Sequence, residues 1–202
     1  EDRVTWQGRT RAPLVDAAVY PSLGPEGMRV WVGVGGSPQS VLRVVRHDLQ
    51  LMLAIIGGEP ARFRPFVDLY HDACARLGRT ARPIGMHSPG FVGASDEAAR
   101  EGFWPHYRDF TNRLGRERGW PSVTRDRYLA EIEHGSLYVG SPQTVARKIA
   151  ASIRALGVAQ FDLKYATGPM PHDQLMSCIR LYGQEVIPMV RELLAGGQTP
   201  TP

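Results

Sequence analysis

The sequence predicts an α/β protein built around a parallel sheet. Strand-like apolar segments are followed by segments of helical periodicity four times along the chain. The strand segments are apolar throughout, which is typical of strands buried on both faces. They lie at Trp31 to Val34, Leu51 to Ile56, within Ile84 to Val92, and at Phe161 to Tyr165. A doubly wound sheet and part of a (β/α)8 barrel both fit this order.

Composition indicates an ordinary globular chain. The 202 residues are 43% hydrophobic and 22% charged. No apolar run approaches the roughly 20 residues that cross a bilayer, and Glu1-Asp2-Arg3 lacks the features of a signal peptide. We therefore expect a cytoplasmic protein without a membrane partner. Cys74 and Cys178 are far apart in sequence, which favours two reduced, buried thiols over a disulfide.

The net charge of +4 does not indicate a nucleic-acid-binding protein. Lys148 and Lys164 are the only lysines among 24 basic residues, and the arginines are spread along the chain. Even the densest segment, Arg108 to Arg127, contains interspersed acidic residues, as solvated helix faces do. We expect no nucleic-acid partner.

Residues 1–29 lack strong periodicity. Turn-forming Pro and Gly residues recur from Gly8 to Gly27, so only Ala17 to Tyr20 is expected to form a short extended piece. A stretch of this length inside a compact domain indicates a functional or wrapping loop. The chain does not begin with Met, which suggests that further residues precede Glu1.

The first strand leads into a turn suited to an anion. In Trp31-Val-Gly-Val-Gly-Gly-Ser-Pro-Gln-Ser40, a β-branched strand reaches a Gly35-Gly36 turn, and Ser37 and Pro38 begin a helix that extends to about Asp48. The first N–H groups of a helix lack internal partners and carry partial positive charge, and glycines let a phosphate approach the backbone. The alternative is that turn geometry alone requires these residues.

The next two strands are separated by a helix. Leu51 to Ile56 is followed directly by Gly57-Gly58, and a helix is expected from about Ala61 to Leu77, ending at Gly78. In the third strand, His87-Ser88-Pro89-Gly90 interrupts the apolar pattern.

The stretch at about 96–134 is too long for a simple crossover. Ser95 caps a helix, Pro105 and Gly115 are expected to break it, and a further helix is expected from about Thr124 to Ile132. We interpret the excess as an added helical pair or a lid.

The beginning of the first helix is nearly repeated later. Gly140-Ser-Pro-Gln-Thr-Val-Ala-Arg147 matches Gly36-Ser-Pro-Gln-Ser-Val-Leu-Arg43, although no long strand or glycine pair precedes the second copy. We favour an ordinary helix N-terminus for that copy. This helix runs to Leu156, and a last helix runs from about His172 to Leu194 with a bend near Pro188.

A dinucleotide-binding fold is disfavoured, because Pro38 follows Gly33-x-Gly35 where the third glycine of G-x-G-x-x-G belongs. The ordered series instead resembles the luciferase-like monooxygenases, the flavin-dependent family that includes bacterial luciferase. The resemblance is carried by Trp31 to Pro38, Leu51 to Gly58, Tyr138 to Ile149 and Phe161 to Tyr165.

This resemblance implies a (β/α)8 TIM barrel, of which the chain is similar to the second half. Residues 1–29 would be the excursion loop, 30–195 the half barrel with a helical insertion at about 96–134, and 196–202 a disordered tail. The implied cofactor is reduced FMN, with F420 as the alternative, and the implied activity is oxidation of a small organic substrate, often with O2. The expected partner is a second copy in a homodimer or the missing N-terminal half of the barrel. Either this chain is a fragment of a larger protein, or a partner chain supplies that half.

The residues at the carboxyl ends of the predicted strands are the candidate site, because barrels bind ligands there. Gly35, Gly36 and Ser37 are the candidates for the flavin phosphate, and Ile56, Gly57 and Gly58 would line the same mouth. His87 is the candidate general acid or base, with a structural histidine as the alternative. No metal site is expected. A non-catalytic flavin-binding protein and a structural half-barrel that needs a partner chain are the alternative functions.

Overall fold

A computed structural model describes residues 3–25 and 27–196 of the chain. The chain divides into two compact units, Glu1–Val30 and Trp31–Pro202. The predicted disordered tail at 196–202 lies outside the described residues except for Gly196. Within the described ranges, no helix has the length and apolar character that crossing a bilayer requires.

The first unit contains a β-hairpin, so the prediction of an irregular loop at 1–29 was wrong. Strand β1 (Arg3–Trp6) pairs antiparallel with β2 (Leu14–Ala18), and the register shifts between Val4 and Trp6. An ion pair of 2.7 Å joins Arg3 to Asp16 across the hairpin. Such short strands, interrupted by a shift in register, leave little periodicity for a sequence pattern to reveal.

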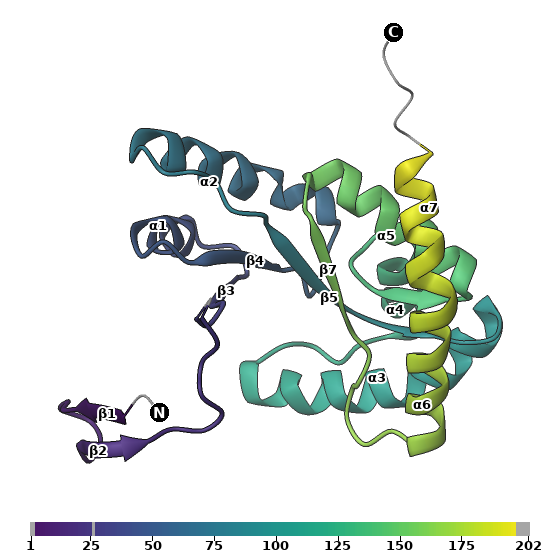
Figure 1. The fold of residues 1–202 in the computed structure, drawn as a ribbon. Coiled ribbons are helices and arrows are strands. Elements are labelled where there is room, and N and C mark those ends of the chain that lie inside the picture. Colours follow the sequence, from purple (N-terminus) through teal and green to yellow (C-terminus); the bar gives the residue numbers. More distant parts are fainter. Residues whose placement is uncertain (1–2, 26, 197–202) are drawn as a thin grey trace, which may run out of the picture. The chain divides into compact units, whose positions relative to one another are not determined.

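The second unit is organised around a parallel sheet of five strands (Figure 1). They are β3 (Trp31–Val34), β4 (Gln50–Ala54), β5 (Gly85–Val92), β6 (Tyr138–Gly140) and β7 (Gln160–Lys164). β3 pairs with β4, β4 with β5, β7 with the first five residues of β5, and β6 with its last three. The predicted parallel α/β fold is confirmed. β6 is an addition, because three residues are too few for a strand pattern.

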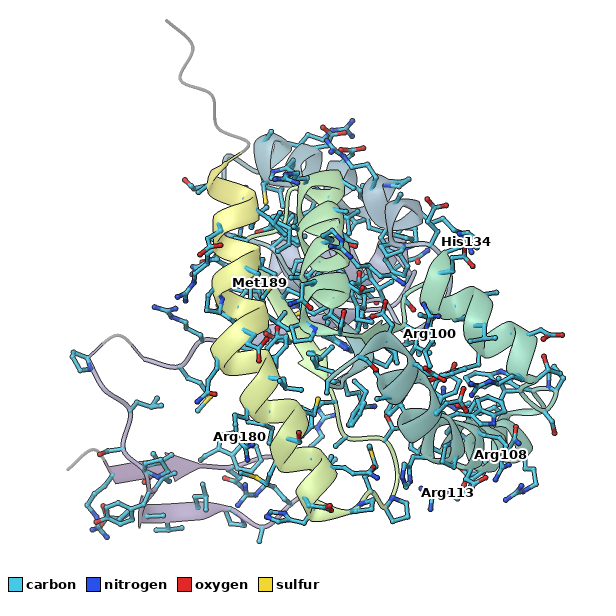
Figure 2. All side chains as sticks on the ribbon, turned by 90° about the vertical axis from the view of Figure 1, so that its right-hand side faces the viewer. Arg100, Arg108, Arg113, His134, Arg180 and Met189 are labelled. Carbon is cyan, nitrogen blue, oxygen red and sulfur yellow. The ribbon has the colours of Figure 1, made fainter. Side chains whose placement is uncertain are left out.

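Helices follow the strands and pack mainly on one face of the sheet. In chain order the helical segments are α1 (Pro38–Arg46), η1 (Pro60–Phe63), α2 (Arg64–Arg76), α3 (Asp96–Arg118), α4 (Arg125–Glu133), α5 (Pro142–Leu156), α6 (His172–Leu181), η2 (Tyr182–Val186) and α7 (Ile187–Ala195). α5 and α7 lie side by side (Figure 1 and Figure 2).

The register separates the two faces of the sheet. One face carries Val34, Leu53 and Met86, which are fully buried and join the apolar residues of α1, α2 and α5 in the core. The other face carries five polar side chains and is called the polar face here. They are Gln50, His87, Gln160, Asp162 and Lys164. Gln160, Asp162 and Lys164 are exposed, whereas parallel sheets normally bury both faces.

β5 lies within Ile84 to Val92, as predicted, and is continuous through His87-Ser88-Pro89-Gly90, where the apolar pattern is interrupted. The Ser88 hydroxyl is completely buried but donates to the Ile55 carbonyl oxygen at 2.8 Å, which satisfies the polar group inside the core. A Cβ on Gly90 would lie 2.2 Å from the Tyr138 carbonyl oxygen. Glycine is therefore needed where β6 approaches this strand.

α3 is one helix of 23 residues, so the predicted breaks at Pro105 and Gly115 were wrong. Phe103 is completely buried and stacks on Phe91 with ring centroids 5.4 Å apart, which anchors the helix on the sheet beside the proline. Gly115 lets the chain fold back closely, since its carbonyl oxygen accepts from the Trp120 N–H at 2.9 Å. The helix ends at Gly119 in the left-handed conformation.

The C-terminal helical segment departs from the α-helix just before Pro188. Residues Tyr182–Val186 form a π-turn between α6 and α7. Proline lacks an N–H and its ring crowds the carbonyl one turn earlier, and a wider turn relieves that contact. Near the other end of this segment, Cys178 is buried and unpaired, as is Cys74, in agreement with the expected thiols.

Candidate functional site

The candidate site is a cleft between α3 and the carboxyl ends of three strands. Its volume is about 320 Å³. Ile56 lines it just after the end of β4, Pro89 from the second half of β5, and Lys164 from the last residue of β7. Thr167 lines it from the loop after β7. Pro89 and Lys164 are partners in the register, so the floor of the cleft continues the polar face.

α3 supplies the opposite wall of the cleft. Tyr107, Phe110 and Leu114 provide apolar surface, and Trp120 follows the helix end. Two cations lie against these rings: the Lys164 ammonium is 5.7 Å from the centre of Phe110, and the Arg118 guanidinium is 5.1 Å from the centre of Trp120. The cleft therefore combines aromatic walls with positive charge.

His87 lies one layer below the cleft floor. Its register partner on β7 is Asp162, and the pair Pro89 and Lys164 comes two residues further toward the carboxyl ends. Two strand residues span about 6.6 Å, so the imidazole is within reach of a group seated in the cleft. Partial burial lowers the pKa of His87, the charge of Lys164 lowers it further, and Asp162 opposes both. The imidazole is neutral at pH 7 and can accept a proton.

The turn after β3 has the geometry of an anion site. Gly36 has φ +128°, and a side chain there would meet no atom within 4 Å, so the backbone is open to a ligand. Within residues 3–25 and 27–196, no protein acceptor is recorded for the N–H groups of Gly36 and Ser37. The Ser37 hydroxyl accepts from the Ser40 N–H at 3.4 Å and donates to the Gln39 side chain at 3.0 Å. These groups fit the phosphate of a flavin.

The second Gly-Ser-Pro-Gln turn meets an acid from its own chain. The Ser141 N–H donates to Asp96 at 2.7 Å, and the Thr144 hydroxyl donates to the same carboxylate at 3.0 Å. Burial disfavours the charge of Asp96, but these hydrogen bonds outweigh it and hold the pKa of the carboxyl below its usual value. The second copy is thus a helix start whose exposed donors are already met by a carboxylate of the same chain, which agrees with the preferred interpretation as an ordinary helix N-terminus.

The turn after β4 is held by Glu131 of α4. Both carboxylate oxygens accept from the Gly58 N–H, at 3.1 and 3.2 Å, and one also accepts from the Ser136 N–H at 3.3 Å. The Gly58 amide already has an acceptor and would not serve a cofactor anion as well. Ile56 is 58% exposed and contributes apolar surface to the cleft. Gly57 lies between them and makes no recorded hydrogen bond within the described chain.

Lys148 of α5 fastens the end of α4, which carries Glu131. Its ammonium donates to the carbonyl oxygens of Glu131, Ile132 and Leu137. Burial lowers the pKa of Lys148 to about 8, and the nearby Glu131 carboxylate opposes this shift. The turn at Gly58 therefore depends on a linked pair of side chains far away in sequence.

The structure brings Ile56 and β5, the strand that carries His87, to the same cleft. Gly35, Gly36 and Ser37 instead follow β3, which pairs with β4 at one edge of the sheet. Sequence reasoning did not identify Tyr107, Phe110, Arg118 or Lys164. Alternation along β7 could have placed Lys164 on the polar face, but nothing local indicates that α3 crosses that face. Among the described residues no cluster of ligand-forming side chains suits a metal ion.

Comparison with known sequences identifies one family. A sequence model described as luciferase-like monooxygenase matches residues 1–160 of the chain. A comparison with curated proteins found no match.

Solved structures of low identity share the fold. They include monooxygenase RslO1 from Streptomyces bottropensis, at 21% identity and TM-score 0.64, with 93% of this chain and 56% of that chain covered. The oxygenating constituent of 3,6-diketocamphane monooxygenase from Pseudomonas putida, in complex with FMN, has 16% identity and TM-score 0.62, with 94% and 58% covered.

A third similar structure is an F420-dependent secondary alcohol dehydrogenase in complex with an F420-acetone adduct. It has 18% identity and TM-score 0.58, with 94% of this chain and 56% of that chain covered. The present chain spans little more than half the length of these structures. With more than half of its residues matched by the family's sequence model, the chain belongs to the luciferase-like monooxygenase family.

Proposed function

We propose that this protein is the cofactor-binding half of a flavin-dependent oxidoreductase that acts on a small organic substrate. The carrying observation is the cleft at the carboxyl ends of β4, β5 and β7, which combines apolar walls, positive charge and a neutral histidine one layer below. Family membership supports redox chemistry. FMN is the preferred cofactor, and it is bound in the similar 3,6-diketocamphane monooxygenase structure. F420 is the alternative, and the similar secondary alcohol dehydrogenase structure contains an F420 adduct.

In this proposal the first helix start holds the cofactor phosphate. The N–H groups of Gly36 and Ser37 would donate to the phosphate oxygens, and the Ser37 hydroxyl would turn from Gln39 to the same anion. Both candidate cofactors carry a phosphate, so this contact alone does not separate them. When bound, a reduced flavin would supply the two electrons that reduce O2, and O2 would be the oxidant of the substrate.

The remaining residues orient the substrate and move a proton. Tyr107 and Phe110 exclude water from one side of the cleft, and Ile56 and Pro89 exclude it from the other. His87, neutral at pH 7, would accept a proton from a group seated above it. Glu131 acts by fixing the Gly58 turn beside Ile56.

The test is a titration of the purified chain with FMN, riboflavin and F420, followed by visible absorption. We expect a perturbed cofactor spectrum, and FMN should bind about tenfold or more tightly than riboflavin because only FMN carries the phosphate. Equal affinity for FMN and riboflavin would contradict the phosphate assignment. No spectral change with any of the three would overturn the cofactor proposal.

A second measurement separates catalysis from binding alone. With chemically reduced FMN and O2, a catalyst accelerates cofactor reoxidation when its substrate is present, whereas a non-catalytic flavin-binding protein does not. If binding requires a separate polypeptide that completes the barrel, the chain alone will fail the titration, and the function will be that of a structural half.

A further inference from the structure

The charge of the cleft lining is one-sided. Two basic residues, Arg118 and Lys164, line the cleft, and none of the described residues lining it is acidic. Across residues 3–25 and 27–196, no ion pair is recorded for either cation. Asp162, which shares a face of β7 with Lys164, instead accepts from the Gln160 amide at 3.0 Å.

The two cations are also held in place. Each lies over an aromatic ring, Lys164 over Phe110 and Arg118 over Trp120, so each has less rotational freedom to lose when it binds an anion. The rings belong to α3 and to the residue just after its end, and the same rings form the apolar wall. An anionic group and an apolar body would therefore be bound by adjacent parts of one surface.

Resting on the proposed function, we propose that the substrate of this cleft is an organic anion, an apolar or aromatic body that carries a carboxylate or a similar acid group. Arg118 and Lys164 bind the acid group, and Phe110 and Trp120 contact the body. His87 lies below the floor, two residues before Pro89 on β5, and so faces the underside of a substrate seated there. The positive charges serve specificity, because a neutral analogue leaves both without a partner.

An anion could also come from the cofactor, whose phosphate has the same charge. The structure offers that phosphate a separate place at Gly36 and Ser37, which follow β3, whereas β4, β5 and β7 border the cleft. We therefore assign the cleft anion to the substrate and let the test distinguish the two sources.

The test compares 4-phenylbutyrate with its neutral amide, 4-phenylbutanamide, by isothermal titration calorimetry on the full chain. We expect the acid to bind about tenfold more tightly than the amide. Lys164→Met and Arg118→Met should each reduce this preference about fivefold, while the affinity for the amide changes little.

Arg113→Met is the matched control. Arg113 also lies on α3 (Figure 2) and also contacts Phe110, at 5.9 Å from the ring centre, but it does not line the cleft. This variant should keep the full preference for the acid. An equal loss in all three variants would mean that only the general positive charge of the surface matters and would overturn the proposal.

The cofactor titration makes the outcomes separable. If Lys164→Met and Arg118→Met lower the affinity for FMN but not for riboflavin, the anion is the cofactor phosphate and the substrate assignment is wrong. Normal flavin binding without a preference for the acid would overturn this inference and leave the proposed function standing. A preference for the acid in a chain that binds no flavin would support the anion site and count against the flavin function.

Discussion

The two Gly-Ser-Pro-Gln turns start helices with the same residues but meet different partners. Asp96 fills the second, and the N–H groups of Gly36 and Ser37 in the first are open. Gly36→Val should lower the affinity for FMN at least tenfold without changing that for riboflavin, because the new side chain blocks the approach of a phosphate. At φ +128° it should also cost about 1–3 kcal/mol of stability.

Gly33→Val is the control for this substitution. Gly33 lies on β3 just before the turn, has open space around it and does not have a left-handed φ. The ratio of FMN to riboflavin affinities should stay as in the unchanged chain. Visible titration of both variants, with circular dichroism to confirm folding, measures the effect. A Gly36→Val protein that retains the ratio would refute the phosphate site.

His87 is the residue whose protonation should govern turnover. Its pKa lies below the usual 6.5, so the base form predominates at pH 7 and is lost as the pH falls through that lowered value. We expect His87→Gln to reduce kcat about 100-fold and to abolish the acidic limb of the pH–rate profile, with FMN affinity unchanged. His71→Gln, on the exposed side of α2, should change neither. If the acidic limb of the pH–rate profile persisted in His87→Gln, the group that titrates there would be a residue other than His87.

At the scale of elements, Asp96 joins α3 to the start of α5. Asp96→Ala should destabilise the protein by about 1–2 kcal/mol, because it removes the acceptor of the Ser141 N–H and the Thr144 hydroxyl. The lowered pKa means that this contribution is complete above the usual 3.8 and is lost as the pH falls through the folded-state value. Urea denaturation at pH 7 and pH 3 should therefore give a difference from the unchanged chain that shrinks on acidification.

Sulfate provides a sharper measurement on the same variant. With the carboxylate gone, the α5 start resembles the open one, and sulfate should raise the melting temperature of Asp96→Ala more than that of the unchanged chain. Glu97→Ala, in the same first turn but exposed, should show neither effect. Equal responses of all three proteins would mean that Asp96 does not occupy an anion position.

Lys148 links α4 to α5 through the carbonyl oxygens at the α4 end. Its pKa is about 8 in the folded chain, against the usual 10.5. Between these values the unfolded chain binds a proton that the folded chain does not, so the free energy of unfolding should gain from this residue as the pH rises from 8 to 10.5. Lys148→Met should lack that gain, and Lys164→Met should keep it. If the free energy of unfolding changed equally with pH in the unchanged chain and in Lys148→Met, the lowered pKa of Lys148 would be contradicted.

For the whole molecule, the sheet is incomplete at its edges. Among the described strands, β3 pairs only with β4 and β7 only with β5. An apolar groove of about 570 Å³ runs beside β7, lined by residues of α5 and α7. Free parallel edges and an exposed polar face favour association. We expect a solution mass of at least twice 22.3 kDa by light scattering.

A charge in the groove should weaken that association. Ile187 lines the groove, so Ile187→Glu places a charge there. Leu42 on α1 is apolar and exposed outside the groove, so Leu42→Glu is the control. Only the first should shift the protein toward the monomer on dilution. A monomer at micromolar concentration in the unchanged chain would show that the edges are tolerated in water, and it would leave completion of the barrel to a different polypeptide.

Local sequence determined four strands of the parallel sheet, the helix starts and the glycine turns, but not β6 or the β1–β2 hairpin. Ser37, Ser95 and Ser141 cap helices where the pattern predicts, because a cap depends on residues only three positions apart. The same local patterns predicted breaks at Pro105 and Gly115 that the fold does not make. Phe103 packs on Phe91 beside Pro105, and the Gly115 carbonyl oxygen accepts from the Trp120 N–H.

Tertiary structure alone decided which of these features can act together. The two similar helix starts are indistinguishable by local chemistry, and only the approach of Asp96 from 45 residues away fills one of them. Likewise, Glu131 accepts from the Gly58 N–H across 73 residues of sequence. The packing of α3 over the polar face places Arg118 in the same cleft as Lys164. A sequence pattern records which residues alternate or cap, whereas the partner of a backbone amide or a cation is set by the packing of distant elements.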